Sequence, residues 1–579
     1  MTVFDFLSMI GGLCMFLFGM SIMGQALERC AGGKLELTLS KMTSGKIRGL
    51  LTGLGITAVI QSSSATTVMV VGFVNSGLMS LGSAINVIMG ANIGTTVTAW
   101  ILSLGGISGD NIFVNLLKPT SFTPVLALVG IVLYTFTKSN RKKDIGMILL
   151  GFSVLMFGMD AMTDSVGGLS EVEGFRNMFV AFEHPLLGVA VGAILTAIIQ
   201  SSSASVGILQ AFAATGAISF GAAVPIIMGQ NIGTCITAIL ASFGTNRNAK
   251  RAAIVHLAFN VIGTAVWLAV FTATDLIFSP AILDEAATIS GIAVAHSLFN
   301  LLCTLLLLPL SGVLEKIVVR LVPDQSGTDV ISELDELLLA TPAVAIERCR
   351  TLTHEMAELS TVALNRSMKC ITEYSTESAA EIRRAESRTD HLEDIIGTYL
   401  VKLGHGMLTD KESAEVSMLL KLIGDYERIC DHAENIVESA EELIEKKITF
   451  SGAAAEELKA MCNATEEILS LAYRTFIDGD YSLVDSVEPL EEVIDEMKAK
   501  LRSAHIARLS RRECSIEAGF VWSDLITDLE RVADHCSNIA GCALDASRLN
   551  MSLHESQRII KTDNPEYRRN YLAYAQKYL

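Results

Sequence analysis

Two long stretches of this sequence lack ionisable side chains. No Lys, Arg, Asp, Glu or His occurs between Leu50 and Gly109, and none occurs between Pro185 and Asn246. A soluble core does not explain such runs, whereas a helix of about 20 apolar residues crosses a bilayer. The sequence therefore predicts an all-α, polytopic membrane protein, with a first transmembrane helix that begins near Met1.

Other scarcities exclude several functional classes. The eleven cysteines form no C-x-x-C pair, which argues against a disulfide framework and against a zinc site. Aromatic residues make up 6% of the chain and its net charge is -18, so basic patches that grip nucleic acid are not expected. No combination of a nucleophile with a base is apparent, and we do not expect an enzyme.

The negative charge lies almost entirely in the C-terminal part. Residues 1–320 hold 16 Lys and Arg against 14 Asp and Glu, while residues 321–579 hold 28 against 48. This division predicts a membrane region followed by an acidic, water-soluble region. We expect a first membrane repeat at 1–143, a second repeat with a final helix at 144–320, a linker at 321–335, a helical domain at 336–550 and a tail at 551–579.

The membrane region is duplicated at a constant offset, which aligns position 57 with position 196. TAVIQSSSA at 57–65 matches TAIIQSSSA at 196–204 in eight of nine positions, and MGANIGTTVTA at 89–99 matches MGQNIGTCITA at 228–238 in eight of eleven. A repeat at constant spacing indicates two structural units of the same kind.

Loop charges indicate that the two copies have opposite orientations. Residues 29–48 are basic and their counterparts at 168–187 are acidic, and the signs also differ between 137–143 and 276–285. Because basic loops stay on the cytoplasmic side, this pattern predicts an inverted repeat with the N-terminus outside and everything after residue 320 in the cytoplasm. Each copy then has room for a re-entrant helical hairpin, near 51–78 and 189–217, with QSSS at its tip.

The polar residues of these stretches are the candidate binding site. Buried polar groups are costly in hydrocarbon unless they face each other or a watery cavity. A broken helix presents free N–H groups and a positive helix end to an anion, while hydroxyl and carbonyl oxygens suit a metal cation better than a proton relay. Packing within the helices is the alternative reading. The candidates are Gln61, Ser62, Ser63, Ser64, Asn92, Thr95, Gln200, Ser201, Ser202, Ser203, Asn231 and Thr234.

Duplicated QSSSA followed by MGxNIGT resembles the type II sodium/phosphate cotransporter family, in its bacterial inner-membrane form, over about residues 1–312. The resemblance implies inorganic phosphate as substrate, sodium as the co-transported ion, import by alternating access, and two QSSS hairpins that meet at a central site beside Thr66. Thr66 and Thr67 become Ser205 and Val206 in the second copy, so equal roles do not follow. A phosphate exporter, a transporter of another oxyanion and a membrane-anchored phosphate sensor stay open as alternatives.

Six helical segments after residue 342 predict two three-helix bundles. YERICDHAENI at 426–436 aligns with LERVADHCSNI at 529–539, and each copy places two carboxylates one turn apart. These carboxylates either bind metal or pair with neighbouring arginines. The pattern resembles PhoU, a regulator of phosphate uptake, over about 336–550. The resemblance implies metal ligands at Glu427, Asp431, Glu530 and Asp534. The fusion of this domain to the membrane region suggests that it regulates transport, with a homo-oligomer or a cytoplasmic partner left open.

Overall fold

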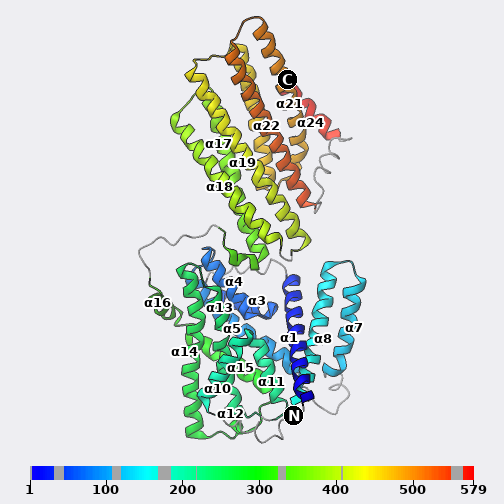
Figure 1. Ribbon diagram of the computed structural model, residues 1–579, viewed down its shortest axis with the longest axis vertical. Coiled ribbons are helices and arrows are strands. Elements are labelled where there is room, and N and C mark those ends of the chain that lie inside the picture. Colours follow the sequence, from blue (N-terminus) through cyan, green and yellow to red (C-terminus); the bar gives the residue numbers. More distant parts are fainter. Residues whose placement is uncertain are drawn as a thin grey trace. The chain divides into compact units, whose positions relative to one another are not determined.

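A computed structural model describes residues 3–31, 45–106, 119–166, 184–216, 218–323, 334–405, 408–548 and 565–579. The chain divides into two compact units, Met1–Ala343 and Val344–Leu579. The all-α prediction is confirmed: within the described ranges no strand forms, and a single isolated bridge pairs Ser219 with Ala286. Figure 1 shows that both units are built of helices.

The first unit contains both membrane repeats. The first repeat comprises α1 (Val3–Ala31), α3 (Lys46–Ile60), α4 (Ser63–Asn75), α5 (Leu81–Ser103), η1 (Leu104–Gly106) and α7 (Pro119–Phe136). The second comprises α8 (Asn140–Val166), α10 (Pro185–Ile199), α11 (Ser202–Ala213), α12 (Phe220–Gly233), α13 (Cys235–Ala241), α14 (Arg247–Phe278) and η3 (Ala281–Leu283). It is followed by α15 (Ile289–Leu307), α16 (Ser311–Leu321) and η4 (Glu336–Ala340). The offset that aligns the two sequence repeats also maps α3 onto α10 at both ends.

Helix lengths agree with a membrane protein that contains broken hairpins. Among the described residues, six helices are long and apolar enough to cross a bilayer. The paired helices α3 and α4, and their counterparts α10 and α11, are shorter than such a span. Most of the two loops at 29–48 and 168–187, whose charges contributed to the predicted orientation, lies outside the described residues, as do residues 107–118.

Equivalent glycines let each hairpin pack tightly against the helix that follows it. A Cβ atom on Gly90 of α5 would lie 2.0 Å from the Leu50 carbonyl oxygen of α3, and one on Gly229 of α12 would lie 2.0 Å from the Val189 carbonyl oxygen of α10. Only glycine permits backbones to approach this closely. The same close packing in both copies fixes the first helix of each hairpin and thereby its tip.

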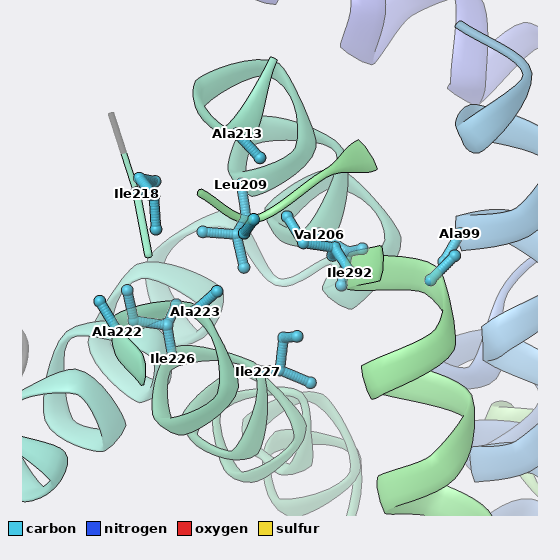
Figure 2. Close-up of a cluster of buried hydrophobic side chains, with 12 residues drawn as sticks. Ala99, Val206, Leu209, Ala213, Ile218, Ala222, Ala223, Ile226, Ile227 and Ile292 are labelled. Carbon is cyan, nitrogen blue, oxygen red and sulfur yellow. The ribbon is translucent and has the colours of Figure 1, made fainter. Parts of the chain in front are cut away.

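Small and branched side chains fill the core around the second hairpin (Figure 2). Side chains from α11, α12 and α15 interlock there, and Ala99 of α5 adds a contact from the first repeat. The amide nitrogen of Gln210 in α11 donates to the Ala99 and Ile289 carbonyl oxygens, each at 3.0 Å. These contacts join α11 to both repeats, so the second tip is held from two sides.

The second unit consists of long antiparallel helices (Figure 1). They are α17 (Pro342–Cys370), α18 (Thr376–Gly404), α19 (Asp410–Glu445), α20 (Gly452–Ile477), η5 (Tyr481–Leu483), α21 (Val484–Ser510) and α22 (Ile516–Ser547). Their inner faces are apolar, and Tyr426 and Trp522 are among the largest fully buried side chains. The predicted pair of three-helix bundles is confirmed by this helix order.

Two further helices form next to the predicted linker and within the predicted C-terminal tail. η4 packs on α4 within the first unit, where the Asn75 amide nitrogen donates to the Asp335 carboxylate at 2.7 Å. The predicted tail contains α24 (Pro565–Tyr578), which packs on α21 and α20. Residues 324–333, the centre of the predicted linker, lie outside the described residues.

Candidate functional site

The hairpin tips are built by one glutamine in each repeat. Gln61 ends α3 with φ 61°, and Gln200 ends α10 with φ 59°. Both residues occupy the left-handed region, which is unfavourable for residues other than glycine. The matching conformations reverse the chain at the same point of each copy, so the following serines begin a new helix. This is the predicted break at QSSS.

The serine after each glutamine caps the second helix of its hairpin. The Ser62 hydroxyl accepts from the Ala65 N–H at 3.1 Å, and the Ser201 hydroxyl accepts from the Ala204 N–H at 3.2 Å. An N-cap of this kind satisfies one of the four free N–H groups at a helix start. The remaining N–H groups and the positive helix end make each tip suited to an anion.

The two tips line one cavity of about 240 Å³. Gln61 and Ser62 of the first tip and Ser201 of the second lie on its wall. The other predicted residues of the two hairpins do not line this cavity. The cavity therefore brings together polar groups from equivalent positions of the two repeats, which are far apart in the sequence.

Helix α1 supplies the rest of the wall, which the sequence reasoning missed. Ser21, Gln25 and Glu28 of α1 line the cavity together with the tips. They recur at helical spacing and so share one face of α1. Their polarity within an apolar helix was the signal that could have identified this face.

The two tips differ in the placement of their glutamine side chains. Gln61 is only 8% exposed, and its carbonyl oxygen accepts from the Thr98 hydroxyl of α5 at 2.8 Å. Its amide nitrogen donates to the Ala58 carbonyl oxygen. The Gln200 side chain is exposed. The first tip is thus tied to its own repeat, while the second is open at this position.

Buried oxygens behind the tips are paired in one copy and unpaired in the other. The Thr57 hydroxyl donates to the Thr66 hydroxyl at 3.0 Å. Their counterparts, the Thr196 and Ser205 hydroxyls, are fully buried and have no hydrogen-bond partner among the residues that the structure describes, and the same holds for the Gln230 side-chain oxygen. The Gln230 amide nitrogen donates to the Ser205 carbonyl oxygen at 3.0 Å, which places Gln230 beside Ser205. Unpaired buried oxygens in an apolar region need a partner, such as a cation.

The predicted NIGT residues are buried and bond to their own helices. Side-chain hydrogen bonds to the carbonyl oxygen four residues earlier hold Asn92, Thr95, Asn231 and Thr234. Asn92 makes one further contact, from its carbonyl oxygen to the His256 imidazole at 3.3 Å. A role in binding stays a prediction for all the candidate residues, including Gln61, Ser62 and Ser201, which line the cavity.

The predicted metal ligands of the second unit have different surroundings in the two copies. Glu427 and Asp431 hydrogen-bond to each other, and burial together with Asp431 raises the pKa of Glu427 to about 7. In the other copy, the Lys498 ammonium lies 2.7 Å from the Glu530 carboxylate, and Arg531 lies 3.5 Å from Asp534.

These surroundings do not favour a metal ion in this arrangement. Among the residues that the structure describes, no three His, Cys, Asp or Glu side chains are arranged to hold one. The Glu530 carboxylate already has a cationic partner in Lys498. Metal binding at Glu427, Asp431, Glu530 and Asp534 therefore stays a prediction.

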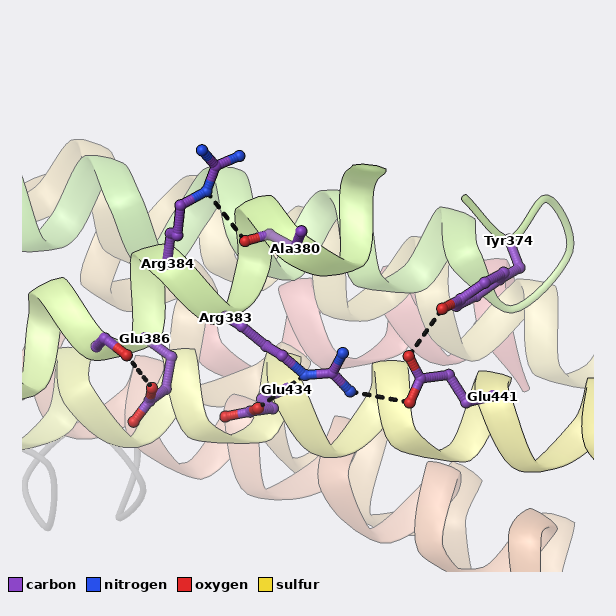
Figure 3. A network of polar contacts seen from close by, with 8 residues as sticks. Tyr374, Ala380, Arg383, Arg384, Glu386, Glu434 and Glu441 are labelled. Atoms are coloured by element: carbon purple, nitrogen blue, oxygen red, sulfur yellow. Dashed lines mark hydrogen bonds and ion pairs between the residues drawn. The ribbon is translucent and has the colours of Figure 1, made fainter. Parts of the chain in front are cut away.

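Ion pairs and histidines tie the acidic helices together. Figure 3 shows Arg383 of α18 between Glu434 and Glu441 of α19, with the Tyr374 hydroxyl donating to Glu441 at 2.7 Å. Between α19 and α22, imidazole–carboxylate pairs cross twice at 2.9 Å, His432 with Asp528 and His535 with Asp425. The crossed pairs come from equivalent positions of the internal repeat and join its two copies.

Comparisons with known proteins match both units. Residues 15–164 and 170–292 match the family described as Na+/Pi-cotransporter, and residues 353–440 and 458–543 match the PhoU domain. YjbB of Escherichia coli, described as a candidate inorganic phosphate export protein, is 23% identical over 548 residues, which cover 93% of this chain and 97% of that protein.

Two further relatives each match one part of the chain. The sodium-dependent phosphate transport protein 2A of Rattus norvegicus is 24% identical over 382 residues, 45% of this chain and 60% of that protein. The phosphate-specific transport system accessory protein PhoU homolog 1 of Thermotoga maritima is 34% identical over 129 residues, 22% of this chain and 55% of that protein. No solved structure matches the chain.

Proposed function

The chain belongs to the Na+/Pi-cotransporter family and carries a PhoU domain, and we propose that it is a sodium-coupled symporter of inorganic phosphate. The single observation that carries the proposal is the shared cavity, where the capped tips of two inverted hairpins lie on one wall. Such a site can open alternately to the two sides of the membrane when the two repeats exchange conformations.

Phosphate binding would rest on neutral groups. The N–H groups at the starts of α4 and α11, the Ser62 and Ser201 hydroxyls and the Gln61 amide are the available donors. Neutral donors hold an anion in a partly dehydrated cavity because each N–H is already oriented by its helix. They leave most of the negative charge uncompensated, so a cation that binds with phosphate lowers the energy of the loaded state.

Sodium is the cation that the available ligands favour. The unpaired oxygens of Thr196, Ser205 and Gln230 are neutral, hard donors within the second repeat. Sodium would satisfy oxygens that now lack partners, whereas a transition metal would require His or Cys ligands. The rat relative is named a sodium-dependent phosphate transport protein, which supports sodium as the coupling ion.

The orientation of the chain follows from loop charge. We place the N-terminus outside an inner membrane and the unit Val344–Leu579 in the cytoplasm, because the basic loops at 29–48, 137–143 and 244–251 then face inward. Accessibility of single introduced cysteines to an impermeant thiol reagent, in intact cells and in inverted vesicles, tests this orientation.

Radiolabelled phosphate flux in proteoliposomes tests the proposed function. An inward sodium gradient should drive phosphate uptake by the parent protein, and Gln61→Ala and Gln200→Ala should each reduce it. Phosphate binding without sodium-driven flux in the parent protein would instead indicate a sensor. Arsenate and sulfate as competitors test the choice of oxyanion.

Export of phosphate is the second candidate function. It is favoured by the name of YjbB, a candidate phosphate export protein that aligns with nearly the whole chain. The same vesicles distinguish the two directions. A symporter accumulates phosphate under an inward sodium gradient and releases it under an outward one. An exporter would release preloaded phosphate from the vesicles irrespective of an inward sodium gradient.

We further propose that the PhoU-like unit regulates transport. Support comes from its acidic, ion-paired helices and from its fusion to the membrane unit in one chain. Removal of residues 344–579 should change how uptake responds to phosphate supply. Identical kinetics and an identical phosphate response in the truncated and full chains would contradict a regulatory role.

A further inference from the structure

One face of α1 runs along the cavity that contains both tips. Leu17, Met20, Ser21, Gly24, Gln25 and Glu28 line it, a span of about 17 Å at the helical rise of ~1.5 Å per residue. α1 passes the first tip at Gly24, where an added Cβ would lie 3.8 Å from the Ile60 carbonyl oxygen. Glu28 follows one helical turn later, so its carboxylate lies beside the tip.

Among the described residues that line this cavity, Glu28 is the one with an ionisable side chain. The neighbouring Arg29 attracts it, but the Arg29 guanidinium also donates to the Asp144 carboxylate of α8 at 2.7 Å. That ion pair holds the positive charge of Arg29 against α8. The cavity thus receives a carboxylate without a matching cation among its lining residues.

A carboxylate in a cavity that takes up phosphate has two opposite effects. It repels the anion when the cavity holds no cation, and it attracts a cation that would compensate both negative charges. The Ser21 hydroxyl and the Gln25 and Gln61 amides line the same wall and offer further oxygens. Oxygen donors with one carboxylate are a ligand set for a small, hard cation.

We propose that Glu28 binds a co-transported sodium ion beside the serine tips, at a site separate from the unpaired oxygens of Thr196, Ser205 and Gln230, and thereby makes phosphate binding conditional on sodium. This inference rests on the proposed function, because it assigns a residue to the coupling of the same site. It accounts for coupling without an ionisable side chain in either hairpin. With sodium absent, the carboxylate disfavours phosphate, and with sodium bound it no longer does.

Equilibrium binding of radiolabelled phosphate to the purified full-length protein, with and without sodium, tests the proposal. Glu28→Gln should bind phosphate without sodium on the order of tenfold more tightly than the parent, because a unit charge is removed from a small cavity. Sodium should then enhance its binding much less. Asp284→Asn, an exposed loop carboxylate neutralised in the same way, should behave like the parent.

Glu28→Asp keeps the charge and withdraws it by one methylene. Glu28→Asp should retain sodium-dependent phosphate binding but require several-fold more sodium. If Glu28→Gln does not fold, Glu28→Asp alone tests the role of Glu28. Unchanged sodium dependence in either folded variant would overturn the proposal. So would phosphate binding by the parent protein that rises on acidification but not on addition of sodium, since a proton would then be the partner of Glu28.

Binding and flux separate this proposal from the proposed function. If the parent protein binds phosphate with sodium but shows no sodium-driven flux, the symport function fails while the role of Glu28 is still decided by binding. If flux is sodium-driven and the Glu28 variants keep the parent's sodium dependence, only the role of Glu28 fails.

Discussion

Replacement of Gln61 by alanine and by glycine separates the backbone of the first tip from its side chain. Both variants lose the side-chain hydrogen bonds of Gln61 with Thr98 and Ala58, which together are worth about 1 kcal/mol inside a membrane protein. Alanine keeps the unfavourable left-handed conformation at φ 61°, whereas glycine relieves roughly 1 kcal/mol of it. We therefore expect Gln61→Ala to be about 1 kcal/mol less stable than the parent and Gln61→Gly to be nearly as stable as the parent.

We expect phosphate uptake to depend on the presence of the Gln61 side chain rather than on the stability of the variant. If the Gln61 amide contacts phosphate or sodium, both variants should lose uptake on the order of tenfold, the equivalent of about 1.4 kcal/mol. Thermal unfolding in detergent and phosphate uptake in proteoliposomes measure the two effects. Gln200→Ala is the matched comparison at the second tip: its exposed side chain predicts unchanged stability, and its predicted role in binding would reduce uptake. Full uptake by Gln61→Gly would refute the reasoning.

Three further predictions concern packing and charge. Gly229→Ala would place a Cβ 2.0 Å from the Val189 carbonyl oxygen and should prevent recovery of folded protein, whereas Gly55→Ala, with open space around it, should fold normally. The raised pKa of Glu427, about 7 against 4.5, means that the folded state keeps a proton that the unfolded chain releases, so stability falls as pH rises between these values. Glu427→Gln should flatten that fall and raise the unfolding temperature above pH 7; an unchanged pH profile would argue against it. Lys498→Gln should cost about 2 kcal/mol by removing the nearest cation from Glu530, and Lys498→Gln with Glu530→Gln should recover most of it in thermal unfolding.

Local sequence determined the breaks in the hairpins. Four polar residues inside a charge-free stretch cannot continue a lipid-facing helix, and the structure ends α3 and α10 at the two glutamines. The constant offset of the sequence repeat also holds in the structure. α3 and α10 begin and end at equivalent residues after the shift that aligns the two QSSS segments.

Contacts between segments that are far apart in the chain could not be predicted from the sequence. Nearly identical QSSS segments gave no sign that Gln61 would be buried while Gln200 is exposed, because that difference depends on the conformation of the whole unit. The few polar residues of α1 do not reveal which helices surround them, so the approach of Glu28 to the tips emerged only from packing. The ion pair of Lys498 with Glu530 likewise joins two helices whose register the sequence does not specify.

Whether the two tips hold one phosphate is tested most directly by a double-mutant cycle on phosphate binding. Ser62→Ala, Ser201→Ala and the double variant are titrated with radiolabelled phosphate at saturating sodium. If both tips contact the same ion, the losses should be non-additive, with a coupling energy well above ~0.5 kcal/mol. Losses that add within that margin would mean that the tips act separately, which contradicts a shared site.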